Sequence, residues 1–140
     1  MIGRLKRWLR ARGALPEELR AELEAEGIVV LEERVRGTVL FRGYVMHGQR
    51  PRSGHQSVTA TLVLTDRRLV VHGTGATHLE VPRGAGWLEH GLAEPDQLKL
   101  AYDAEAANPQ RAGEIEILLN TPRAADIRAR LQESMPTRAS

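Results

Sequence analysis

One stretch of the chain, residues 58–73 (VTATLVLTDRRLVVHG), constrains the fold more than any other. Apolar and threonine side chains alternate along its first half, and a second β-branched run follows the turn at Asp66. Aspartate suits a tight turn because its short side chain accepts hydrogen bonds from the amides just ahead. The stretch therefore predicts a β-hairpin whose inward-facing side chains are Leu62, Leu64, Leu69 and Val71.

Further short strands are predicted on both sides of this hairpin. Compact or alternating apolar runs indicate strands at residues 28–31, 35–46, 77–82, 87–90, 98–102 and 114–119. Within the second of these, Gly37 and Gly43 predict bulges or bends. Polar composition predicts loops at 47–56 and 104–112.

Helical spacing appears only near the two ends of the chain. Residues 1–13 read as a short basic amphipathic helix, and a second helix begins at Pro16 and ends at Gly27. The last helix is predicted to start with Thr121 as N-cap and Pro122 in the first helical position. The predicted apolar stripes are Leu15, Leu19 and Leu23 in the second helix, and Ala124, Ile127, Leu131 and Met135 in the last.

This order of elements resembles a pleckstrin-homology-like (PH-like) barrel, in which a bent seven-stranded antiparallel sheet is closed at one end by a final helix. Residues 61–71 (TLVLTDRRLVV) are similar to the hairpin of bacterial PH-like and GRAM-type domains, and residues 120–126 (NTPRAAD) to the start of their last helix. The resemblance covers about residues 28–135. It implies a PH-like barrel with its C-terminal helix at 27–136. With the helical segment at 1–26, which lies outside the resemblance, and a frayed tail at 137–140, the expected fold class is α+β.

What the resemblance implies for function is binding, usually of membranes or proteins, and seldom catalysis, so no enzymatic activity is expected. Lipid-binding PH domains carry a lysine and arginine pattern on the first two strands and their loop. Here that region offers only Arg42, Arg50 and Arg52, a departure that argues against recognition of inositol phosphates.

Composition excludes several other classes of function. The chain has no cysteine, so disulfides, thiolate zinc sites and cysteine nucleophiles are excluded, and a reducing cytoplasm is expected. No apolar run reaches the ~20 residues of a membrane-spanning helix. A net charge of +2 gives no global field for nucleic acid. No metal or cofactor is expected, since the histidines lack ligand spacing: His47, His55, His72, His78 and His90.

Candidate binding residues lie in the strand predicted at 35–46, in the loop that follows it and in the hairpin turn. Arg42, Arg50, Arg52 and His55 are candidates for holding an anion or a partner, because the planar guanidinium bonds oxyanions through two donors. The alternative is a solvated loop without a ligand. Arg67 is a further candidate contact, although one arginine of the turn is expected to fix the turn itself.

The basic first helix offers a second candidate surface, made of Arg4, Leu5, Lys6, Arg7, Trp8 and Leu9. Such a helix can lie on an anionic membrane with its apolar side chains inserted. Packing of Leu5 and Trp8 on the barrel or on a second copy is the favoured alternative.

The sequence thus predicts a non-enzymatic PH-like module for protein–protein interaction, or for attachment to a membrane-associated complex at the inner face of the membrane. The expected partner is a protein, with peripheral membrane contact and a homodimer as further options and no role for nucleic acid. Two alternatives stay open: a carrier of a small molecule or lipid in the barrel interior, and a peripheral binder of anionic membranes through the first helix.

Overall fold

The computed structural model describes residues 15–46, 48–73 and 76–136. The predicted first helix, its candidate residues at positions 4–9 and the predicted tail at 137–140 lie outside these ranges. The fold class is α+β, as predicted: seven antiparallel strands form a curled sheet, a half-barrel, with a short helix before it and a helix after it.

The strands follow the order β4-β3-β2-β1-β7-β6-β5 across the sheet. Their bounds are β1 (Ile28–Met46), β2 (Arg52–Thr65), β3 (Arg68–Gly73), β4 (Ala76–Pro82), β5 (Glu89–Glu94), β6 (Gln97–Asp103) and β7 (Arg111–Asn120). The helices are α2 (Glu17–Glu26), α3 (Ala104–Ala107) and α4 (Ala124–Ser134).

The described chain contains two compact units. Unit 1 comprises the described residues up to Arg36 together with Val58–Arg83, and unit 2 comprises Gly37–Ser57 and the described residues from Gly84 onward. The long strands β1 and β2 each contribute residues to both units.

Unit 1 contains the predicted hairpin, which is confirmed. β2 and β3 pair antiparallel, with Leu62 opposite Val71 and Leu64 opposite Leu69, and all four side chains are buried. The opposite face of the hairpin is buried as well, because Val63 and Val70 pack against α2. Leu15, just before α2, and Leu23 of α2 cover this face, with Leu19 packed against them.

The end of α2 depends on glycine. Gly27 has a φ of +89°, and its N–H donates to the Glu24 carbonyl at 3.1 Å. A Cβ at this position would lie 2.7 Å from Oδ2 of Asp66 in the hairpin turn. The predicted stop at Gly27 is therefore confirmed, and the same residue allows the helix end to approach the turn.

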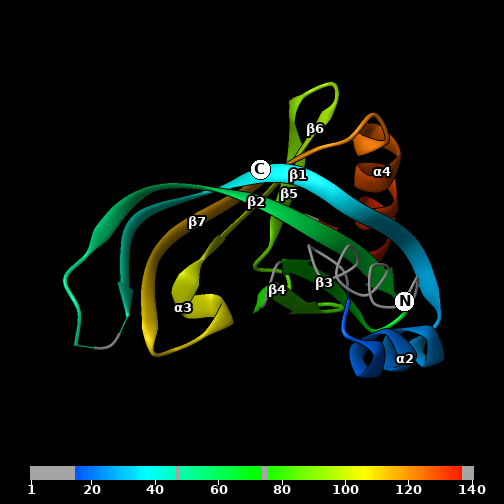
Figure 1. Cartoon of the computed structure of the whole chain (residues 1–140), viewed down its shortest axis with the longest axis horizontal. Helices are drawn as coiled ribbons and strands as arrows, with labels where there is room; N and C mark the ends of the chain where they lie inside the picture. The colour runs from blue at the N-terminus through cyan, green and yellow to red at the C-terminus, as the bar shows by residue number, and fades with distance from the viewer. Residues whose placement is uncertain (1–14, 47, 74–75, 137–140) are drawn as a thin grey trace, which may run out of the picture. The chain divides into compact units, whose positions relative to one another are not determined.

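Unit 2 is built on strands β5, β6 and β7 with α4 packed against β5 and β6 (Figure 1). Ile127 and Leu131 of α4 are buried, which confirms the central pair of the predicted stripe. The buried strand residues Leu98, Leu100, Ile117 and Leu119 form the apolar face of this unit's sheet.

Several predicted boundaries were wrong. The predicted loop at 47–56 contains the start of β2 at Arg52, whose first six residues are exposed and polar. Such residues lack the apolar alternation of a half-buried strand, yet their backbone pairs all the same. The predicted loop at 104–112 likewise holds α3 and the start of β7 at Arg111.

Four smaller differences concern the extent and ends of elements. The separate runs at 28–31 and 35–46 form one strand, and the run at 87–90 becomes a strand only from Glu89. α4 begins at Ala124 rather than at Pro122. Thr121 does not cap the helix as predicted: its Oγ1 accepts a hydrogen bond from the N–H of Arg123, two residues on, at 3.1 Å.

Candidate functional site

The register of β5, β6 and β7 builds a polar sheet face in unit 2. Leu98, Leu100 and Tyr102 of β6 are buried, so the intervening Lys99, Ala101 and Asp103 lie on the other face. Strand pairing places acidic residues directly beside these positions: Ala101 lies between Glu89 of β5 and Glu116 of β7. Asp103 lies directly opposite Glu114 of β7.

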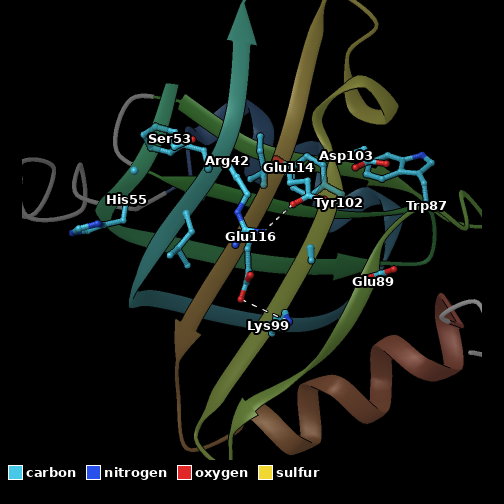
Figure 2. Close-up of a pocket in the computed structure, with 15 residues that line it drawn as sticks. Arg42, Ser53, His55, Trp87, Glu89, Lys99, Tyr102, Asp103, Glu114 and Glu116 are labelled. Atoms are coloured by element: carbon cyan, nitrogen blue, oxygen red, sulfur yellow. Dashed lines mark ion pairs between the residues drawn. The ribbon is translucent and has the colours of Figure 1, made fainter. Parts of the chain in front are cut away.

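This face forms the floor of an open groove of about 760 Å³. Figure 2 shows the groove side chains, with the residues of β6 and β7 at the centre, His55 and Ser53 at one end and Trp87 at the other. All of the lining belongs to unit 2: Leu40, Phe41, Arg42, Ser53, Gly54, His55, Trp87, Glu89, Lys99, Ala101, Tyr102, Asp103, Glu114, Ile115 and Glu116. This set is named the acidic groove below.

Carboxylates outnumber cations in the acidic groove. Arg42 pairs with Glu114 (Nη1 to Oε2, 3.6 Å) and Lys99 pairs with Glu116 (Nζ to Oε1, 3.8 Å), as the dashed lines in Figure 2 show. The other two carboxylates, Glu89 and Asp103, have no ion-pair partner within residues 15–46, 48–73 and 76–136. The groove therefore carries excess negative charge.

Aromatic side chains stand at the Trp87 end of the groove. The rings of Trp87 and Tyr102 lie 5.8 Å apart at an interplanar angle of 54°. Burial, and then the nearby Tyr44, raise the pKa of Tyr102 to about 12, so its hydroxyl stays neutral at physiological pH. In the same unit the Arg111 guanidinium lies over the Tyr44 ring, 6.0 Å from its centroid.

The predicted anion-site residues do not converge. Arg42 and His55 line the acidic groove, but Arg50 and Arg52 are exposed and do not line it, and Arg67 belongs to unit 1. Ser53, which was expected in a loop, lies on β2 and accepts a hydrogen bond from the N–H of Gly43 at 2.9 Å. The structure thus brings only two of these five candidates to one place.

Sequence reasoning missed most of the groove residues. The alternation at residues 114–119 already placed Glu114 and Glu116 on the outer face, but nothing in the sequence gives the register that sets Asp103 against Glu114. Within the described ranges no three His, Asp or Glu side chains are grouped to hold a metal ion. Nor is any helix in those ranges long and apolar enough to cross a membrane.

The fold and the groove define an α+β protein with a seven-stranded antiparallel half-barrel, a C-terminal helix and an open, acidic sheet face. This architecture is compatible with a PH-like fold. Comparison of the chain with models of known protein families gives no match, and comparison with curated protein sequences gives none.

Proposed function

We propose that the protein is a non-enzymatic, PH-like binding module and that its acidic groove takes a segment of a protein partner, such as a member of a membrane-associated complex. The seven-stranded half-barrel with its C-terminal helix supports the PH-like assignment. The groove supports the choice of surface, because it is large, open and lined by both aromatic and charged side chains.

The observation that carries the proposal is the pair Asp103 and Glu114. These carboxylates lie directly opposite each other on neighbouring strands, a placement that destabilises a sheet by like-charge repulsion. Arg42 balances Glu114 at 3.6 Å, but its side chain is 86% exposed, so solvent screens the attraction strongly. Proteins retain unfavourable local arrangements of this kind mainly at functional surfaces. A cationic partner would relieve the repulsion between the two carboxylates.

The sign of the charge favours a cationic protein segment over an anionic ligand. An inositol phosphate or an anionic headgroup in this groove would meet four carboxylates and only two cations, Arg42 and Lys99. The carrier alternative gains less support, since the inward-facing Leu98, Leu100, Ile117 and Leu119 are at most 1% exposed.

The test is affinity capture from extracts of the cells that make the protein, with a variant that fills the groove. Ala101 lies on the groove floor, so Ala101→Arg places a long cationic side chain there; Ala129→Arg adds the same side chain on the exposed face of α4. We expect a partner retained by the wild-type chain and by Ala129→Arg to be lost from Ala101→Arg. Equal retention by both variants would refute the groove as the binding surface.

A second measurement separates a protein partner from a membrane. Sedimentation of the full chain with anionic vesicles should be weak and should not change in Ala101→Arg. If Ala101→Arg instead strengthens sedimentation severalfold above Ala129→Arg, the groove faces the membrane and the proposal of a protein partner fails.

A further inference from the structure

We propose that the Trp87 end of the acidic groove is a binding subsite for an arginine side chain of the partner. The subsite consists of Trp87, Tyr102, Asp103 and Glu89 and is named the arginine subsite below (Figure 2). This inference deepens the proposed function and rests on it, because it supplies the chemistry by which a polypeptide segment is recognised.

The strand register brings the four residues together. Glu89 lies opposite Ala101, so Trp87, two residues earlier in the chain, reaches the level of Asp103, two residues later on β6. The 5.8 Å separation of the Trp87 and Tyr102 rings confirms that the chain before β5 stays beside the end of β6. Tyr102 alternates with Asp103 along β6 and is largely buried, but it also lines the groove, as do Trp87 and both carboxylates. The two aromatic rings and the two carboxylates thus border the same end of the groove.

The distribution of cations singles out this end. Glu114 and Glu116 already pair with Arg42 and Lys99, whereas Glu89 and Asp103 of the arginine subsite have no ion-pair partner among the described residues. Both are exposed, so neither side chain is committed to the core. A cation from a partner would give Glu89 and Asp103 ion pairs like those that Glu114 and Glu116 already have.

The geometry favours a guanidinium group. Glu89 and Asp103 are diagonal neighbours on adjacent strands, which places their Cα atoms roughly 7–8 Å apart. A planar guanidinium with five N–H donors can bond carboxylates on two sides at once, and its face stacks on an indole ring. A lysine ammonium is a compact, strongly hydrated charge that gains less from both features.

The same unit already contains one contact of this kind. Arg111 lies with its guanidinium carbon 6.0 Å from the centroid of the Tyr44 ring, within the range of a cation–π interaction. The arginine subsite offers the better aromatic partner, a tryptophan, and adds the carboxylates that Arg111 does not contact.

The test uses the full chain with Trp8→Phe, which leaves Trp87 as the only tryptophan. The probes are three synthetic hexapeptides of matched length: hexa-arginine, hexa-citrulline, which is nearly isosteric and uncharged, and hexa-lysine. Binding is followed by Trp87 fluorescence and by calorimetry at low and physiological salt. We expect saturable binding of hexa-arginine, at least tenfold weaker binding of hexa-citrulline, and hexa-lysine in between.

Charge-neutral variants locate the binding. Asp103→Asn and Glu89→Gln should each weaken hexa-arginine binding at least fivefold. Glu94→Gln, which removes an equal charge from the far end of β5 outside the groove lining, should change it less than twofold. An equal loss in all three variants would mean general attraction to an acidic surface, and equal or tighter binding of hexa-lysine would overturn the choice of guanidinium.

Failure of this inference can be told apart from failure of the proposed function. If Asp103→Asn and Glu89→Gln keep the natural partner that Ala101→Arg loses, the groove binds its partner without the arginine subsite and the inference alone fails. If Ala101→Arg also keeps the partner, the proposed function fails.

Discussion

Arg68 holds Glu26 through two parallel hydrogen bonds, from Nε to Oε1 at 3.1 Å and from Nη2 to Oε2 at 2.8 Å. The pair joins the last turn of α2 to the first residue of β3, and Arg68 also bonds Glu22 of α2 and Glu80 of β4. Thr65 adds a hydroxyl bond to Oε1 of Glu26 at 2.8 Å. These hydrogen bonds, led by that from Arg68, lower the pKa of Glu26, so the carboxylate is charged at neutral pH.

We expect Glu26→Gln to lower the free energy of unfolding by about 1–3 kcal/mol, between the values for exposed and for fully buried pairs. The Glu26 and Arg68 side chains are 14% and 18% exposed, so solvent screens their attraction only in part. Urea unfolding of the variant measures the loss. The control is Glu24→Gln, since Glu24 forms an exposed pair with Arg20, and a loss equal to that of Glu26→Gln would contradict the prediction.

His90 makes stability depend on pH. Its Nε2 lies 2.7 Å from the Met135 carbonyl and therefore donates to it, and burial lowers the pKa of the imidazole below 6.5. Below pH 6.5 the unfolded chain takes up a proton that the folded chain resists, so stability falls as the solution is acidified. Between pH 7 and pH 5 the wild-type protein should therefore lose more unfolding free energy than His90→Gln. An equal loss in the wild-type protein and in His90→Gln over this range would contradict the prediction.

Leu131 anchors α4, with a side chain that is 0% exposed. Leu131→Ala should cost about 2–5 kcal/mol, the range for removing a large apolar side chain from a core. Chemical unfolding monitored by circular dichroism gives the value. Ala129→Ser on the exposed face of the same helix should stay within about 0.5 kcal/mol, and a similarly small loss for Leu131→Ala would show that α4 is peripheral.

Arg34 has a φ of +55°, in the left-handed region that a side chain disfavours. Arg34→Gly should therefore be more stable than Arg34→Ala by about 1 kcal/mol, because glycine removes the steric cost of Cβ. At the exposed Arg36 of the same strand, where φ is not positive, the order should reverse, with glycine about 0.5–1 kcal/mol worse than alanine. Thermal unfolding of the four variants checks both orders.

The sequence predicted those elements whose buried apolar side chains recur at a regular spacing. Alternation identified the hairpin, and the spacing of Ile127 and Leu131 identified the buried face of α4, because burial on one side leaves a periodic pattern. The first residues of β2 leave no such pattern. They are exposed and polar, and strand pairing there depends on backbone groups that every residue carries.

The acidic groove could be predicted only in part for a related reason. Each strand shows which of its residues face outward, but the neighbour of Asp103 depends on how β6 and β7 are aligned. The strand order β1-β7-β6 also places residues of distant segments, such as Arg42 and Glu114, side by side. Predicting the groove requires those pairings, which are long-range properties of the sheet.

The burial of Val63 and Val70 beneath Leu15 and Leu23 has a practical consequence for handling the protein. The change from helix to strand near Gly27 suggests that residue as the start of a shortened chain. Such a chain would lack Leu15 and Leu23 and would expose Val63 and Val70 on the hairpin. An exposed apolar strip of this kind invites self-association in solution. Expression of a shortened chain should therefore retain Leu15 and everything after it, and a fragment starting at Gly27 should precipitate where the longer one stays dispersed.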